Sequence, residues 1–159
     1  MNKKGFTLIE LLIVVAIIGI IAAIAIPNLL VALQKGKQKA TMGDMKSIGS
    51  AIESYITDWS FAPQVAAGPI NTMAVNWFQP FYIKILPQTD GWGTIFRYDH
   101  SAIAAGGDLY TIQSWGRNKL NGPIPAPPNN LYTVTSLADF NNDIFFSNGI
   151  YTVGPQVKR

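Results

Sequence analysis

The sequence contains no cysteine and only one histidine, His100. Without cysteine the chain forms no disulfide and offers neither a thiol nucleophile nor a thiolate ligand. A lone histidine does not suffice for a histidine-based metal centre. Charged residues make up only 13% of the chain, and the net charge of +3 falls short of the dense basic surface that nucleic-acid-binding proteins carry. We therefore expect no thiol chemistry and no specific nucleic-acid partner.

Signals for catalysis are also scarce. Asp99-His100-Ser101 contains the residue types of a hydrolase triad, but immediate neighbours cannot adopt triad geometry by themselves. The sequence has no nucleophile elbow, phosphate-binding loop or metal-ligand spacing. These observations predict that the protein is not an enzyme.

The sequence does have a long apolar run near its N-terminus. A polar, basic stretch, residues 1–5, precedes it, and no charged residue occurs from Leu11 to Gln34. As a helix, Leu8 to Leu33 would span roughly 39 Å, more than the ~30 Å hydrocarbon core of a bilayer. The positive charge of Lys3 and Lys4 favours a cytoplasmic N-terminus. The run therefore predicts a membrane helix with its N-terminus inside.

Glu10 is the exception in this segment. A carboxylate inside a membrane costs on the order of 3 kcal/mol and is usually retained because it has a partner. The next cation along the chain is Lys35, which is too distant to serve. Cleavage after Gly5 would create an α-amino group on Phe6 near the depth of Glu10. In a bundle of such helices, that amine could pair with Glu10 of a neighbouring copy and fix the register.

These residues carry a family resemblance. The stretch Lys4-Gly5-Phe6-Thr7-Leu8-Ile9-Glu10 and the apolar run after it resemble, over residues 4–30, the class III signal of type IV prepilins and type II secretion pseudopilins. The resemblance implies cleavage after Gly5 by prepilin peptidase, N-methylation of Phe6, and a docking role for Glu10. Methylation leaves the amine cationic. The implied partners are copies of the chain, an inner-membrane assembly platform and minor pilins.

Two other interpretations of the segment stay open. It could be a secretory signal peptide, since Ala23-Ile24-Ala25 offers a cleavage site. Glu10 within the apolar run and the length of the run both count against this interpretation. It could also be an uncleaved anchor that holds a monomeric binding module, residues 62–159, at the membrane.

Pro27 interrupts the apolar helix. Proline lacks an N–H and clashes with the carbonyl four residues earlier, here that of Ala23, so we expect a bend or a locally loosened helix. Pro27 resembles a proline that the pilin family has at this place. In that family the proline accompanies local melting of the helix within the filament. A simple kink that redirects the helix is the alternative.

Residues 34–61 form the amphipathic half of the helix. Apolar residues recur there at steps of three and four, which predicts one buried stripe made of Met45, Ile48, Ile52, Tyr55, Ile56 and Trp59. We expect this stripe to pack on the C-terminal domain. The helix should end near Trp59–Phe61, before Pro63.

Residues 62–159 contain short β-like runs and predict a small antiparallel sheet. Asn148-Gly149 is a strong type I′ hairpin signal, and residues 122–128 form a stiff, proline-rich connection. The predicted strands are Thr94–Tyr98, Leu109–Trp115, Ile144–Ser147 and Ile150–Val153. The expected fold class is α+β, a long N-terminal helix packed on this sheet as in type IV pilins.

A second resemblance concerns this domain. Residues 86–98 resemble the D-P-W-G-x-P-Y-x-Y stretch of major type II pseudopilins, with Gly91 where the family usually has proline. Residues 108–116 resemble the strand that follows it. The protein is therefore expected to be most like the major pseudopilin of type II secretion, and the alternative is a major type IV pilus pilin.

One loop is a candidate calcium site. Asp139, Asn141 and Asp143 place oxygen ligands close together in the sequence, and oxygen is the ligand calcium prefers. Resemblance to calcium-binding pseudopilins points the same way. The spacing is not that of an EF-hand, and the alternative is an Asx-rich turn without a metal.

Taken together, the sequence predicts four segments: a leader 1–5, an apolar transmembrane and filament-core helix 6–33, an amphipathic helix half 34–61 and a β-rich domain 62–159. We expect the precursor in the cytoplasmic (inner) membrane and the assembled filament in the periplasm or outside the cell.

Overall fold

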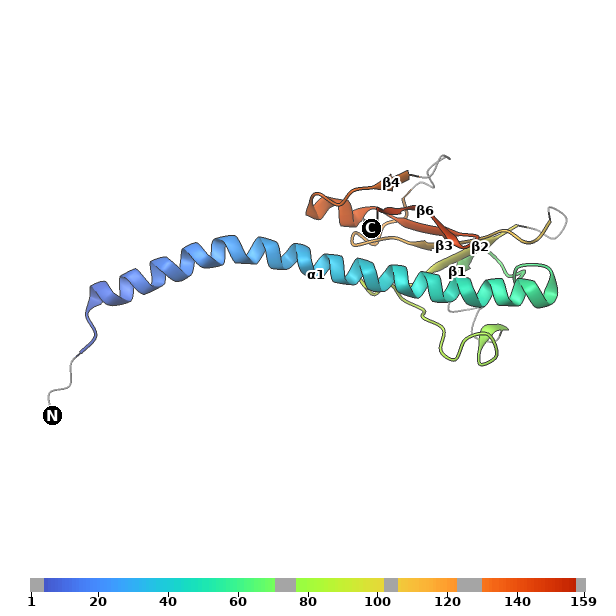
Figure 1. The fold of residues 1–159 in the computed structure, drawn as a ribbon, viewed down its shortest axis with the longest axis horizontal. Helices are drawn as coiled ribbons and strands as arrows, with labels where there is room; N and C mark the ends of the chain where they lie inside the picture. The colour runs from blue at the N-terminus through green and yellow to red at the C-terminus, as the bar shows by residue number, and fades with distance from the viewer. Residues whose placement is uncertain (1–4, 71–76, 102–105, 123–129, 157–159) are drawn as a thin grey trace. The chain divides into compact units, whose positions relative to one another are not determined.

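The computed structural model describes residues 5–70, 77–101, 106–122 and 130–156. One long helix, α1, is followed by short strands and a 3₁₀ helix, η3 (Figure 1). The bounds are α1 Leu8–Trp59, β1 Gly68–Pro69, β2 Arg97–His100, β3 Tyr110–Ser114, β4 Asn130–Tyr132, η3 Leu137–Asn141, β5 Ile144–Ser147 and β6 Ile150–Pro155. The chain divides into two compact units, Met1–Lys35 and Gly36–Arg159, and α1 contributes to both.

The strands form one mixed sheet in the order β1-β2-β3-β5-β6-β4. Neighbouring strands are antiparallel except for β4 and β6, which are parallel. The prediction of a purely antiparallel sheet was therefore wrong at this edge. The cause is that β6 continues to Pro155, and its outer backbone groups need partners, which β4 supplies. The α+β arrangement itself is confirmed.

The predicted strands are found with small shifts. β5 has the expected bounds, β3 is one residue shorter at each end, and β6 is two residues longer. The run predicted at 94–98 instead forms a strand at Arg97–His100, preceded by an isolated bridge between Thr89 and Ile95. The predicted connection 122–128 lies, except for Gly122, outside the described residues.

The amphipathic half of α1 packs on the sheet through its apolar stripe. Met45, Ile48 and Ile52 are completely buried, and Tyr55 is nearly so. The strands contribute Tyr98, Tyr110, Ile112, Ile144 and Phe146 to the same core, and Phe96 joins it from directly before β2. Trp59 is the exception, because it is 57% exposed rather than buried. The helix ends at Trp59, so this side chain lies on its last turn and stacks on Tyr55 with ring centroids 6.0 Å apart.

Two glycines make this packing possible. A Cβ at Gly49 of α1 would lie 2.3 Å from Cε1 of Phe146, so only glycine lets the helix approach the sheet this closely. In the β5–β6 hairpin, Asn148 and Gly149 have φ values of 46° and 81°, which is the backbone of a type I′ turn. The hairpin prediction is confirmed. Tyr110 links α1 to this hairpin. Its hydroxyl donates to Glu53 of α1 at 2.9 Å and accepts from the Gly149 N–H at 3.2 Å.

Candidate assembly site

The predicted cleavage site lies directly before the helix. Gly5 and Phe6 are exposed and not helical, and α1 begins at Leu8. A Cβ added at Gly5 would meet no atom within 4 Å, so packing gives no reason for glycine at this position. Gly5 is accessible at this position, and its role in cleavage stays a prediction.

Thr7 and Glu10 form a capping box at the start of α1. The Glu10 carboxylate accepts from the Thr7 N–H at 2.8 Å and from the Thr7 hydroxyl at 2.6 Å. The Thr7 hydroxyl in turn accepts from the Glu10 N–H at 3.3 Å. This reciprocal pair satisfies backbone donors that the first turn of a helix otherwise leaves open. The T-x-x-E spacing that produces it is visible in the sequence, although Glu10 was predicted to pair only with a neighbouring chain.

The carboxylate keeps an oxygen for a second partner. Both hydrogen bonds from Thr7 go to Oε2 of Glu10, and within the residues that the structure describes none is made to Oε1. The free oxygen and the adjacent Phe6 lie at the same end of α1. Capping by Thr7 and pairing with an external amine are therefore compatible.

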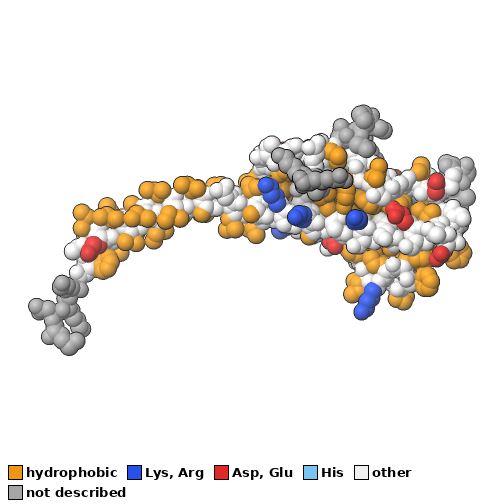
Figure 2. Space-filling model, in the orientation of Figure 1, with side chains coloured by type: hydrophobic (Ala, Val, Ile, Leu, Met, Phe, Trp, Pro, Cys, Tyr) orange, Lys and Arg blue, Asp and Glu red, His pale blue; other side chains and the backbone are white. Residues whose placement is uncertain are grey.

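The apolar half of α1 presents hydrophobic side chains to its surroundings. Figure 2 shows them along this part of the helix, with an acidic residue near its start. Leu8, Ile20 and Ile24 are 81%, 65% and 66% exposed, and the other large apolar residues from Ile9 to Leu33 are also exposed except for the half-buried Val31. By length and composition α1 could cross a membrane, a test that an N-terminal signal sequence would also pass. Such a surface requires lipid or other helices to cover it.

Pro27 lies inside α1, which continues through it without a break. The neighbouring Asn28 donates from its side-chain amide to the carbonyl oxygen of Ile24 at 3.2 Å. The carbonyl oxygen of Ala23 lacks its usual helical hydrogen bond, because Pro27 has no N–H to donate. This position is therefore the weakest point of the backbone ladder in the apolar half.

The three candidate calcium ligands accept hydrogen bonds from different groups. Oδ2 of Asp139 accepts from the N–H groups and hydroxyls of Thr135 and Ser136. These bonds, the Ser136 N–H first, hold the pKa of Asp139 below its usual value. The side-chain oxygen of Asn141 accepts from Nε of Arg117 at 3.0 Å.

Asp143 is buried and accepts hydrogen bonds from a separate set of donors. Its Oδ2 accepts from Nε2 of Gln113 at 2.8 Å and from the Gly122 N–H at 2.9 Å. Burial raises its pKa above the ordinary value. Within the described ranges, no group of three or more His, Cys, Asp or Glu side chains is placed to hold a metal. The predicted set includes Asn141 and relies on only two carboxylates, so calcium binding stays a prediction.

The turn at residues 90–93 is docked on α1. Asp90 is buried and accepts from the Trp92 and Thr94 N–H groups at 2.9 and 2.8 Å. The Gly91 N–H donates to the Thr41 hydroxyl at 2.8 Å, and a Cβ at Gly91 would lie 2.4 Å from the Lys37 carbonyl oxygen. Proline could not donate this bond, which explains why this chain has glycine at the position.

His100 has a structural environment. It lies in β2, and its ring nitrogens are 2.9 and 2.6 Å from the carbonyl oxygens of Ser101 and Val65. The side chains of Asp99 and Ser101 take no part in these two bonds. The Asp99 carboxylate accepts from the backbone N–H of His100, and Ser101 uses its carbonyl oxygen. The Asp99-His100-Ser101 run is therefore not assembled as a triad.

Comparisons with known proteins agree with this architecture. The prokaryotic N-terminal methylation motif matches residues 1–26, and the type II secretion system protein G family matches residues 28–124. The chain belongs to the type II secretion system protein G family. The first match covers Gly5, Phe6 and Glu10, and the second includes the amphipathic half of α1 together with β1 to β3.

Individual relatives support membership in the protein G family. The type II secretion system core protein G of Pseudomonas aeruginosa is 32% identical over 124 residues, which cover 73% of this chain and 87% of the relative. The protein of the same name from Vibrio cholerae is 32% identical over 123 residues, covering 73% and 84%. The type IV major pilin protein PilA of Myxococcus xanthus is 49% identical over 57 residues, or 36% of this chain and 26% of that protein. The comparison with solved structures returns no match.

Proposed function

We propose that this protein is the major structural subunit of a type IV pilus-like filament of type II protein secretion. The observation that carries the proposal is the exposed apolar half of α1 with its capped Glu10, followed by a domain of the protein G family. The subunit has no catalytic activity of its own. Its partners are its own copies, prepilin peptidase, minor pilins and the inner-membrane assembly platform.

Processing converts the precursor into an assembly-competent subunit. Prepilin peptidase cuts between Gly5 and Phe6, and the new amine of Phe6 is methylated. Before assembly, lipid of the cytoplasmic membrane covers residues 6–33. The filament then forms in the periplasm, where neighbouring helices replace lipid around the same apolar surface and van der Waals packing and interhelical hydrogen bonds stabilise the bundle.

Glu10 sets the register of this assembly. Its Oε2 stays with Thr7, while Oε1 accepts from the methylated amine of Phe6 in a neighbouring subunit. A charge-assisted hydrogen bond of this kind is about twice as strong as a neutral one. A misaligned helix would leave both charges unpaired in an apolar core, which is strongly unfavourable.

The experiment that tests the processing step is intact mass and terminal sequencing of the protein recovered from cells. A chain that begins at methylated Phe6 supports the proposal. A chain that begins at Ile26 would indicate an ordinary secreted domain, and one that begins at Met1 an uncleaved anchor with a monomeric binding module. Either of the last two results would overturn the filament proposal.

The role of Glu10 is tested by two substitutions that differ in what they preserve. Glu10→Gln keeps the reciprocal cap, because glutamine also serves at the third position of a capping box, but it removes the charge. Glu10→Ala removes both. We expect sedimentable fibres to be lost in both variants. Fibres that persist in Glu10→Gln would show that capping, and not charge pairing, is the role of this residue.

A surface pilus is the second candidate. It is favoured by the similarity to the type IV major pilin of Myxococcus xanthus, which is confined to a short part of the chain. Deletion of the gene separates the two candidates. Loss of secreted enzymes with surface fibres retained supports the secretion filament, whereas loss of surface fibres with secretion intact supports the pilus.

A further inference from the structure

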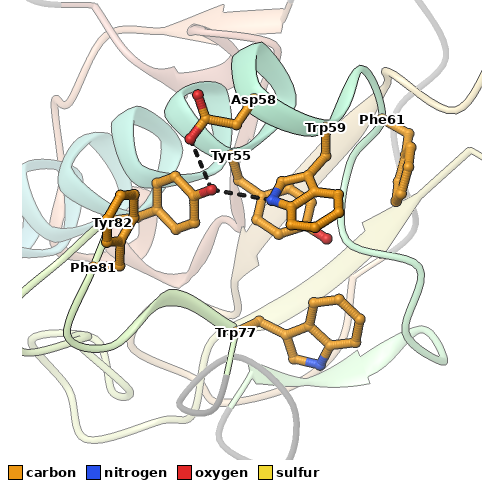
Figure 3. Close-up of a pocket in the computed structure, with 7 residues that line it drawn as sticks. All are labelled: Tyr55, Asp58, Trp59, Phe61, Trp77, Phe81 and Tyr82. Atoms are coloured by element: carbon orange, nitrogen blue, oxygen red, sulfur yellow. Dashed lines mark hydrogen bonds between the residues drawn. The ribbon is translucent and has the colours of Figure 1, made fainter.

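An aromatic hollow lies beside the C-terminal end of α1 and is separate from the assembly segment (Figure 3). Its volume is about 840 Å³, within the range of small-molecule sites. Residues of the last two turns of α1, Phe61 just after the helix, and residues of the chain at 77–82 line it. They are Tyr55, Asp58, Trp59, Phe61, Trp77, Phe81 and Tyr82.

The rings that face this hollow are unusually accessible for aromatic side chains. Phe81 is 80% exposed, Trp59 57% and Trp77 46%. Tyr55 is nearly buried, and its ring lies 6.0 Å from each of the Trp59 and Trp77 rings, centroid to centroid. Exposed apolar side chains that cluster in this way usually mark a binding surface.

Hydrogen bonds fix these rings and occupy their polar edges. Nε1 of Trp59 donates to the Tyr82 hydroxyl at 3.1 Å, and that hydroxyl donates to Asp58 at 2.9 Å. Figure 3 shows this chain of bonds from Trp59 through Tyr82 to Asp58. Because the Trp59 N–H and the Tyr82 hydroxyl proton are already used, a ligand meets the faces of these two rings rather than their polar edges.

The charge of the wall selects the ligand. Asp58 is the one charged residue among the described residues that line the hollow. Aromatic faces are electronegative and attract cations, so the carboxylate and the rings both favour a positively charged ligand. We propose that the hollow binds a small soluble molecule that carries a quaternary or N-methylated ammonium group, held by the rings of Trp59, Trp77 and Tyr82 with Asp58 as counter-ion.

The test uses the full chain in a maltoside detergent, which has no ammonium group that could compete. Choline is titrated while tryptophan fluorescence is followed. The matched ligand is the neutral carbon analogue of choline, in which a tert-butyl group replaces the trimethylammonium group. We expect choline to bind about tenfold more tightly than this analogue, since the analogue keeps the shape and loses the cation–π attraction.

Three variants assign the binding to the hollow. Trp77→Ala should weaken choline binding about fivefold. Asp58→Asn should weaken choline binding but leave binding of the neutral analogue unchanged. Leu131→Ala, which removes a 45% exposed apolar side chain outside the hollow, should change neither. A thermal melt of each variant verifies that it is folded.

Two results would overturn the proposal. The first is equal affinity for choline and its neutral analogue, which would make the hollow a general apolar surface. The second is choline binding that Trp77→Ala and Asp58→Asn both leave unchanged, which would place the ligand elsewhere. Neither result bears on filament assembly, because the hollow contains no residue of the apolar segment 6–33.

Discussion

Gly49 and Gly43 occupy the same helix but have opposite requirements. A Cβ at Gly49 would meet Phe146 and the Tyr110 hydroxyl, whereas a Cβ at Gly43 would meet no atom within 4 Å. We expect Gly49→Ala to lower the free energy of unfolding by about 1–3 kcal/mol through overpacking. Gly43→Ala should raise it by about 0.5–1 kcal/mol, because alanine favours the helix. Chemical denaturation of both variants measures the difference, and an equal effect would contradict the close approach at Gly49.

Asp143 stabilises the domain through the two donors that reach its Oδ2. Replacing it by alanine leaves Gln113 and the Gly122 N–H without this acceptor. Bonds to a charged group contribute about 1.5–3 kcal/mol, and we expect Asp143→Ala to cost that much in a denaturation experiment with EDTA present. Asp108→Ala, which removes an exposed carboxylate, is the control and should have little effect.

Repeating the Asp143 measurement with calcium tests the predicted metal site. A ligand that binds only the folded state raises its stability in proportion to the logarithm of the ligand concentration. If Asp139, Asn141 and Asp143 rearrange around an ion, calcium stabilises the wild type and this gain is absent in Asp143→Ala. Equal stability of the wild type in calcium and in EDTA would leave these residues with only their hydrogen-bonding roles.

At the scale of elements, the start of α1 depends on Thr7. Thr7→Ala removes both the cap hydroxyl and its bond to Glu10, at a cost of about 0.5–2 kcal/mol. We expect faster hydrogen exchange in the first turn of α1 but retained fibres, because Glu10 keeps its charge. Thr7→Ser should behave as wild type. Loss of fibres in Thr7→Ala would mean that the cap itself is required for assembly.

The elements differ in how well the sequence predicted them. The apolar run, the stripe around Ile48 and the Asn148-Gly149 hairpin are local patterns, and the structure confirms the elements they predict. The parallel pairing of β4 with β6 was missed because Asn130–Tyr132 is too short for a periodic signal and its partner is distant in sequence. The exposure of Trp59 was missed because periodicity cannot tell where the sheet stops covering the helix.

For the candidate site, Gly5, Phe6 and Glu10 were named from the resemblance of residues 4–30 to a prepilin signal, and the methylation motif covers these positions. Their roles in processing and docking stay predictions. The Thr7 cap was available from its spacing and was overlooked. The aromatic hollow was not available, because Trp59 and Trp77 are brought together only when the chain after α1 returns to the helix end.

For the whole molecule, buried tyrosines make the fold sensitive to alkali. Burial raises the pKa of Tyr132 and of Tyr151 to about 12, compared with about 10 in an unfolded chain. Burial also raises the pKa of Tyr98 and Tyr110 well above the ordinary value. The unfolded chain therefore loses these protons first as pH rises, so stability holds up to about pH 10 and falls above it.

The free energy of unfolding is expected to fall steeply enough with pH to be measured. Between about pH 10 and pH 12, each of these tyrosines lowers the free energy of unfolding by about 1.4 kcal/mol per pH unit. Denaturant titrations across this interval measure the slope. Tyr132→Phe removes one titrating group and should make the decline shallower. A decline that begins below pH 9 would point to other groups.

The two edge strands of the sheet have a further consequence. One edge strand, β1, has two residues and ends in Pro69, and the other, β4, has three. Short edges, and proline in particular, resist the addition of a strand from another chain. Domains crowded side by side in a fibre are thereby prevented from fusing into a continuous cross-β ribbon.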